Sequence, residues 1–301
     1  MQFNEWLNEW LEVKIKPSTK TRTYEKYRSG VYKYISPALG DVSLEDLNAI
    51  RLQRFTLSLS EGGLAPSTVN CLVSILKNSL RTAVSYGITE RQYSDSLVRR
   101  KGDIRSVACL NKEEQRILES YIINREKSSL YGILVSLYMG LRIGELLALT
   151  WADIDLEKRI MSVTKSCYDR WENGSYVKVV ETPKTASSAR LIPIPDTIFS
   201  LLSYMKRTSR THYVVEGRGG YGAEVRSYQR SFQLVLKKLG LRQMGFHSLR
   251  HTFATRAIEC GMDVKTLSEL MGHKNPSITL TRYTHSLLEH KREMINKLCT
   301  Q

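Results

Sequence analysis

Two stretches in the second half of the chain carry charged residues at spacings that suit the binding of an anion. In the apolar run from Leu130 to Thr150 the only charged residues are Arg142 and Glu145, three positions apart and hence on one face of a predicted helix. A buried guanidinium needs a partner. The pair is therefore either a purely structural ion pair, or an arginine that Glu145 orients while its free edge contacts a ligand phosphate.

The second stretch places His247, Arg250 and His251 on one face of another predicted helix, a face that can bind one anionic group. An ordinary solvated basic face is the alternative, with His247 as a helix cap. Metal binding by the two histidines at i, i+4 is disfavoured, because the glutamate of an H-E-x-x-H motif is missing. Further along, a turn carries His273, and a helix after it carries Tyr283.

The first hundred residues, which precede these stretches, have a helical pattern. Apolar residues from Phe3 to Leu11 recur at helical spacing. Turn signals at Ser36-Pro37, Gly62-Gly63 and Pro66-Ser67 divide the rest into short helices, as in a small bundle. The further predicted helices cover residues 19–36, 43–60 and 67–86.

The remainder is predicted to be a mixed α/β domain. Arg99 to Asp103 is charged and has little to bury, so it begins a linker, and Asn111 with Glu114 approximates a capping box for the next helix. Asn173-Gly174 between two β-rich runs predicts a hairpin, and a polar turn after it would project Lys184 from the sheet edge. The predicted strands are 160–168, 176–181 and 189–194, and the predicted helices are 128–141, 197–207, 224–239, 247–260, 263–271 and 277–297.

The composition favours a basic protein that binds a polyanion. The chain has 301 residues with 45 Lys and Arg against 30 Asp and Glu, a formal charge of +15. Residues 1–101 carry 15 basic against 10 acidic side chains and residues 102–301 carry 30 against 20, so both parts contribute. This distribution suits two lobes that enclose nucleic acid.

Cysteine usage and the N-terminus indicate a cytoplasmic protein. The five cysteines are scattered without a C-x-x-C pair, which argues against a disulfide framework and a zinc site. The first residues are acidic where a signal peptide is basic. The longest charge-free runs have about 15 residues, too few to span a bilayer.

Taken in order, these motifs resemble the tyrosine recombinases, also called the phage integrase family. The resemblance rests on G-L-R-I-G-E-L around Arg142, the hairpin lysine, H-S-L-R, G-H and R-Y-T-H, and it covers nearly the whole chain. It implies a mainly α fold with a small β-sheet. A helical core-DNA-binding domain over 1–101 and a linker over 102–110 would precede a mixed α/β catalytic domain over 111–301 with a tail helix.

The resemblance also implies a catalytic set and its roles. The expected catalytic residues are Arg142, Lys184, His247, Arg250, His273 and the nucleophile Tyr283, with Glu145 in support. Tyrosine attack on a DNA phosphodiester would leave a 3′-phosphotyrosine and a free 5′-hydroxyl. Because two arginines supply the positive charge and each step exchanges one phosphate ester for another, no metal, cofactor or ATP is expected.

The implied partners are double-stranded DNA with specific core sites, three further copies of the chain in a synaptic homotetramer, and a directionality factor, in the bacterial nucleoid. The apolar positions from Leu287 to Leu298 fit a helix packed on its own domain or on a neighbouring protomer. Alternatives are a Xer-type resolvase, a type IB topoisomerase-like enzyme and a non-catalytic site-specific DNA-binding protein. The sequence of the hairpin segment from Thr182 to Pro195 favours integrases of phages and conjugative elements. The start of the core-binding helices near Met1 favours a simpler recombinase or an integrase that lacks an arm-site-binding domain.

Overall fold

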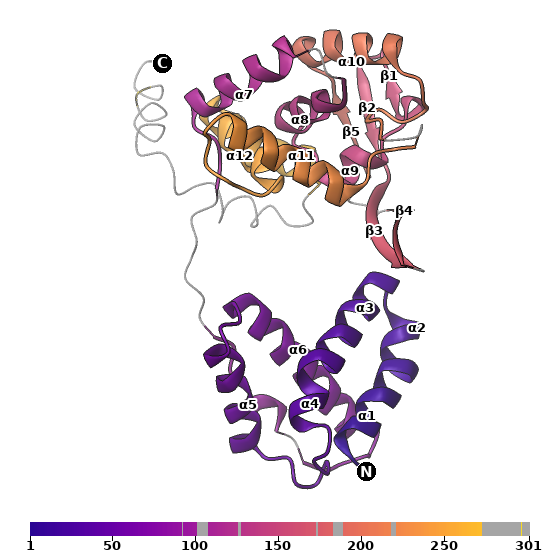
Figure 1. Cartoon of the computed structure of the whole chain (residues 1–301), viewed down its shortest axis with the longest axis vertical. Helices are drawn as coiled ribbons and strands as arrows, with labels where there is room; N and C mark the ends of the chain where they lie inside the picture. Colours follow the sequence, from indigo (N-terminus) through magenta and orange to yellow (C-terminus); the bar gives the residue numbers. More distant parts are fainter. Residues whose placement is uncertain are drawn as a thin grey trace. The chain divides into compact units, whose positions relative to one another are not determined.

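The chain divides into two compact units, Met1–Arg105 and Ser106–Gln301, in the computed structural model (Figure 1). Each unit has a main hydrophobic core of its own, and the second also has a small apolar cluster between its last two described helices. The structure describes residues 1–91, 93–100, 108–125, 128–172, 174–182, 189–217, 221–272 and 296. The predicted linker residues 102–107, the loop 183–188 and the predicted helix 277–297, apart from residue 296, lie outside these ranges.

The first unit is built from helices, as its sequence predicts. The indole N–H of Trp6 donates to the Ser79 carbonyl at 3.2 Å and that of Trp10 to Thr82 Oγ1 at 3.3 Å, which ties the first helix to the longest one. The amphipathic stripe from Phe3 to Leu11 is fully buried. The helices are α1 (Phe3–Trp10), α2 (Lys16–Ser18), α3 (Thr21–Gly30), α4 (Ser36–Leu39), α5 (Ala49–Glu61) and α6 (Pro66–Ser85), with a 3-10 turn at Ser94–Ser96.

Two predictions for this unit were wrong in detail. Ser36-Pro37 does not end a helix, because a π-turn over Val31–Ile35 comes directly before it and α4 begins with the proline in its first turn. A proline is tolerated there because its missing N–H is not needed in the first turn. The helix predicted from residue 43 begins only at Ala49, where the Asn48 side chain accepts a hydrogen bond from the Arg51 N–H.

The second unit is built around one apolar helix, α8, and the helices α7, α10 and α12 pack against it (Figure 1). The predicted capping box is present: Asn111 Oδ1 accepts from the Glu114 N–H and Glu114 Oε2 from the Asn111 N–H, both at 2.8 Å. The helices are α7 (Lys112–Asn124), α8 (Ser128–Met139), α9 (Ile143–Ala148), α10 (Asp196–Thr208), α11 (Val225–Lys238), α12 (His247–Glu259) and α13 (Val264–Met271), with a 3-10 turn at Trp151–Asp153.

Two small antiparallel sheets flank these helices. The predicted hairpin at Gly174 is confirmed, since Glu172 pairs with Ser175 at its end. The single strand predicted over 160–168 was wrong: it is two strands in two sheets, broken where Lys165 turns to form an ion pair with Asp153 at 2.7 Å. The sheets have the orders β1-β2-β5 and β3-β4, from β1 (Ile154–Asp155), β2 (Ile160–Val163), β3 (Ser166–Glu172), β4 (Ser175–Glu181) and β5 (Arg190–Pro193).

The apolar run from Leu130 to Thr150 contains two helices: α8, which ends two residues before the end of the predicted helix 128–141, and the short α9 that follows it. The chain leaves α8 after Met139 through Gly140, whose φ of +63° favours glycine. A Cβ atom at this position would lie 2.5 Å from the Phe253 ring, so the close packing against α12 also requires glycine. The break places Arg142 at the N-cap of α9. No helix within the described ranges is long and apolar enough to cross a membrane.

Candidate active site

Arg142 is held at the start of α9 by Glu145, as the spacing of the two residues predicts. The Arg142 N–H donates to Glu145 Oε2 at 2.9 Å, and Arg142 Nη1 donates to Glu145 Oε1 at 2.6 Å. The Glu145 carboxylate accepts both bonds, so it fixes the backbone and the side chain of the arginine at the first turn of α9. The Arg142 side chain remains 38% exposed, so its guanidinium has an open edge.

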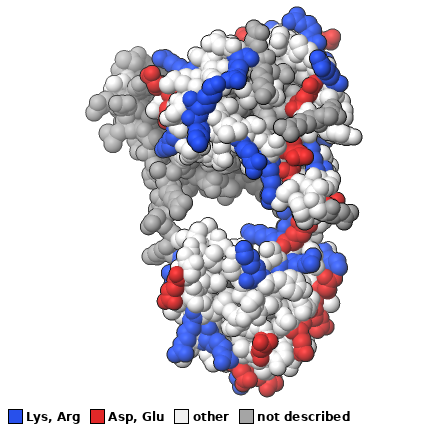
Figure 2. Space-filling view, viewed as in Figure 1, with Lys and Arg blue, Asp and Glu red and all other residues white. Residues whose placement is uncertain are grey.

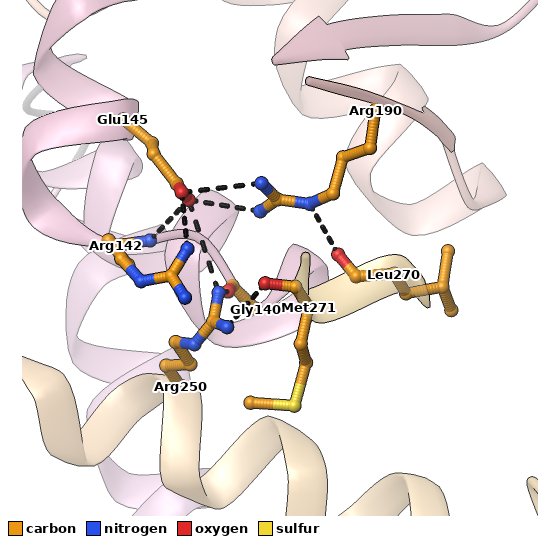
Figure 3. A network of polar contacts seen from close by, with 7 residues as sticks. All are labelled: Gly140, Arg142, Glu145, Arg190, Arg250, Leu270 and Met271. Carbon is orange, nitrogen blue, oxygen red and sulfur yellow. Dashed lines mark hydrogen bonds and ion pairs between the residues drawn. The ribbon is translucent and has the colours of Figure 1, made fainter. Parts of the chain in front are cut away.

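Glu145 is the centre of a buried charge cluster (Figure 3). Its side chain is 7% exposed and accepts hydrogen bonds from Arg142 and from Arg190. Burial acts to raise the pKa of this carboxyl, but the hydrogen bonds and charge of Arg190, with the charge of Arg142, outweigh it and hold the pKa at about 2. Glu145 is therefore ionised throughout the physiological range.

Arg190, on β5, is the residue of this cluster that sequence reasoning missed. Its Nη2 lies 2.9 Å from Glu145 Oε2, its Nη1 donates to Glu145 Oε1 at 3.2 Å, and its Nε donates to the Leu270 carbonyl at 2.6 Å. A signal was available in the strand pattern: Arg190 shares a strand face with the buried Ile192. A charged residue at an inward strand position requires a buried acid, and Glu145 is that acid.

Arg250 lies deep in the unit, with 1% of its side chain exposed. From α12, its Nη1 donates to the Gly140 carbonyl at 2.7 Å and its Nη2 to the Met271 carbonyl, and Nη1 is also 4.0 Å from Glu145 Oε2 (Figure 3). Gly140 lies two positions before Arg142, and Met271 directly precedes Gly272, the C-cap of α13. Arg250 thus joins α12 to α9 and to the end of α13.

The predicted face of His247, Arg250 and His251 is divided in the structure. The rings of His247 and His251 contact each other with centroids 4.6 Å apart and planes at 83°. His247 is exposed at the first position of α12, whereas Arg250 points into the interior. Among the residues that the structure describes, no group of three or more His, Cys, Asp or Glu side chains could hold a metal ion.

Three of the predicted residues, Lys184, His273 and Tyr283, lie outside the described ranges. Two of them nevertheless lie close in the sequence to described residues of the cluster. Arg190 is six positions after Lys184, and Gly272, the C-cap of α13, directly precedes His273. The Glu145 cluster therefore binds β5 and the end of α13, the described elements next to these two residues in the sequence.

The arrangement can bind an anion. Three guanidiniums, of Arg142, Arg190 and Arg250, surround the one carboxylate of Glu145, which leaves an excess of two positive charges in a mostly buried site. Arginine stays protonated and presents paired donors that match phosphate oxygens. The exposed edge of Arg142 marks the side from which such an anion would approach.

The chain matches two models of protein families. The phage integrase family matches residues 108–290, and the phage integrase N-terminal SAM-like domain matches residues 2–60. A tyrosine recombinase XerC-like protein of Caldanaerobacter subterraneus subsp. tengcongensis is 27% identical over 97% of this chain and 81% of its own length. The transposase from transposon Tn916 of Enterococcus faecalis is 26% identical over 92% of this chain and 72% of its own.

Solved structures share the fold. The Tn1549 transposon integrase in complex with a circular intermediate DNA superposes with a TM-score of 0.85 at 21% identity, over 99% of each chain. A lambda integrase dimer bound to a COC′ core site gives a TM-score of 0.75 at 18% identity, over 95% of this chain and 79% of that one. From the match over residues 108–290, the chain belongs to the phage integrase family, the tyrosine recombinases, which cleave and rejoin DNA strands.

Proposed function

We propose that this recombinase moves a mobile DNA element by site-specific strand exchange, with Tyr283 as the nucleophile. The cluster of Arg142, Glu145 and Arg250 carries the proposal, because it supplies a fixed positive site for a phosphate. Relatives named as transposases of Tn916 and as the ICEBs1 integrase of Bacillus subtilis support the element as substrate.

The two arginines would bind the non-bridging oxygens of the scissile phosphate. Attack by an oxyanion on a phosphodiester adds negative charge in the pentavalent transition state, and prealigned guanidiniums stabilise that charge without reorganisation. Arg142 offers its open edge directly. Arg250, whose Nη atoms donate to the carbonyls of Gly140 and Met271, would exchange one of these bonds for a phosphate oxygen.

The proton transfers fall to the remaining residues. A tyrosine with a reference pKa of about 10 needs a base, and His247, exposed at the start of α12, is our candidate for taking the Tyr283 proton. The oxygen of Tyr283 then bonds to phosphorus while the bond to the 5′-oxygen breaks, and Lys184 protonates the leaving oxygen. His273 would hydrogen-bond the phosphate. The reverse sequence, with a 5′-hydroxyl from another strand, rejoins the DNA.

The energetics leave the direction of the reaction open to a partner. Each step exchanges one phosphate ester for another, so the bonds broken and formed are equivalent and neither integration nor excision is favoured by the chemistry. Binding energy from another molecule must select the direction, and we propose a directionality factor for that role.

DNA recognition would involve both units. Lys and Arg side chains lie on the visible face of each unit (Figure 2), and the chain carries a formal charge of +15. We propose that residues 1–101 bind a core site and that four protomers assemble on two such sites. The lambda integrase tetramer bound to a Holliday junction, with the same fold at 19% identity, supports this assembly.

The test is recombination between two labelled duplexes that carry the junction sequence of the element, in EDTA. Products with exchanged arms are expected with the wild-type protein. Tyr283→Phe should bind the same duplexes in a gel shift and give neither product nor covalent complex. Relaxation of supercoiled plasmid without exchange would favour the topoisomerase alternative, and exchange only at a chromosomal dimer-resolution site would favour the Xer alternative.

A further inference from the structure

We propose that Arg190 is a positioning residue for DNA cleavage, which holds Glu145 so that Arg142 presents its open edge to the scissile phosphate. This rests on the proposed function of Arg142 as a phosphate ligand. Arg190 donates hydrogen bonds to two described residues, Glu145 and Leu270. Two of its nitrogens donate to the two oxygens of Glu145, at 2.9 Å and 3.2 Å, and the third to the Leu270 carbonyl at 2.6 Å.

Burial separates the roles of Arg190 and Arg142. The Arg190 side chain is 6% exposed, and both of its Nη atoms donate to the Glu145 carboxylate, whereas those of Arg250 donate to neutral carbonyls. Moving Arg190 to a phosphate would leave a buried carboxylate without its ion-pair partner, so Arg190 acts on the substrate through Glu145. The Arg142 side chain is 38% exposed and gives Nη1 to the same carboxylate. Arg142 is therefore the arginine that can contact the substrate, and Arg190 holds the carboxylate that positions it (Figure 3).

Arg190 also connects three segments that are far apart in the sequence. Arg190 stands on β5, Glu145 on α9, and Leu270 in the last turn of α13. The last carbonyls of a helix lack partners within it, so the Nε bond to Leu270 satisfies one of them and fixes the end of α13. One guanidinium thus joins the strand that follows Lys184, the helix that Arg142 caps and the helix that leads to His273.

The contact is also closely fitted. Gly272 has a φ of +60°, and a Cβ atom there would lie 3.0 Å from Arg190 Nη1 and 3.2 Å from its Cδ. The guanidinium consequently packs against a position that accepts only glycine without displacement. A lysine could keep one charge here but could not bridge two carboxylate oxygens and a carbonyl at once.

The experiment compares two DNA substrates in single-turnover cleavage. One has the natural phosphodiester at the cleavage site, and the other has a methylphosphonate, which carries no charge there. If Arg190 acts through Arg142 on phosphate charge, Arg190→Met should slow cleavage of the natural substrate by about 100-fold, since a misplacement near 1 Å costs that much. The defect relative to wild type should be much smaller on methylphosphonate. Arg190→Lys should retain most of the defect.

Arg256→Met is the matched control. Arg256 lies on α12, forms an ion pair with Glu259 at 2.5 Å and donates to the Leu110 carbonyl at 2.9 Å, so it has the same kinds of bond and none to Glu145. Its loss should slow cleavage of both substrates equally or not at all. Thermal melts set the assay temperature below every transition, and if Arg190→Met does not fold, Arg190→Lys carries the comparison.

Equal slowing of both substrates by the Arg190 variants would overturn the proposal and leave the residue a purely structural role. A defect relieved instead by a 5′-phosphorothiolate, whose sulfur leaves without a proton, would also overturn it and place the effect on Lys184. Failure of the proposed function is distinct, because wild-type protein would then form no covalent complex with either substrate.

Discussion

Glu145 Oε2 lies 2.9 Å from Arg190 Nη2, although the two residues are on different elements and 45 positions apart. Neither side chain is more than 7% exposed. A buried ion pair is costly to break because the remaining partner keeps an uncompensated charge. This pair therefore connects the stability of the second unit to the geometry of its arginine cluster.

Glu145→Gln should make the protein less stable in a pH-dependent way. The pKa of Glu145 is about 2 in the folded chain against 4.5 in the unfolded one, so the carboxylate contributes about 3 kcal/mol at neutral pH. Because the folded pKa is lowered, this contribution is complete above about pH 5 and is lost as the pH falls toward 2. Urea unfolding of both proteins from pH 7 to pH 3 measures the difference.

All other carboxyl groups titrate equally in the wild-type protein and in Glu145→Gln, so their contributions cancel in the difference between the two unfolding free energies. The gap between the two unfolding free energies should narrow steadily as the pH falls. A gap that stays constant over this range would show that the charge of Glu145 contributes nothing to the stability of the fold.

Gly272→Ala should damage cleavage more than it damages stability. Gly272 and Gly240 have nearly the same φ, +60° and +66°, so alanine at either position costs about 1 kcal/mol of backbone strain. Only at Gly272 does the new Cβ meet Arg190, whereas nothing lies within 4 Å of it at Gly240. Covalent-complex formation by the two variants, assayed beside their urea unfolding, tests this. Equal cleavage rates would contradict it.

Part of the active site could be predicted from the sequence, and part could not. Spacing alone predicted the contact of Arg142 with Glu145, because residues three apart meet in a first helical turn as well as in a helix interior. The end of the first helix was predicted to within two residues, but the separate helix that begins after Arg142 was not, since the apolar pattern continues on both sides of Gly140. The turn at Gly140 combines a φ of +63° with close packing on Phe253, which is 113 positions away.

Long-range partners account for the other differences. Local signals predicted the capping box of Asn111, the Gly174 hairpin and, nearly to their ends, the helices α8 and α10 to α13. The division of residues 160–168 between two sheets depends on β2 pairing with β5, about 30 residues further on. Arg190 was missed for the same reason: its acid lies on a different element, and only the fold brings the two together.

The cysteines should differ in reactivity. Burial raises the pKa of Cys167 to about 11 despite the nearby charge of Lys178, so very little of its thiol is ionised at pH 8, whereas Cys260 is exposed. Iodoacetamide should therefore alkylate Cys260 in the native protein well before Cys167. Peptide mass spectrometry at successive times measures both sites, with urea-unfolded protein as the control in which they react alike. Comparable native rates would be inconsistent with a buried Cys167.

We propose that Tyr283 forms the covalent bond to DNA. The most direct measurement is to trap the protein in EDTA on a nicked DNA substrate that carries the element junction, digest the complex with trypsin and nuclease, and locate the nucleotide adduct by mass spectrometry. The account predicts the adduct on the peptide from Tyr283 to Lys291, and none in Tyr283→Phe. An adduct on any other of the 16 tyrosines, or one that persists in Tyr283→Phe, would contradict it.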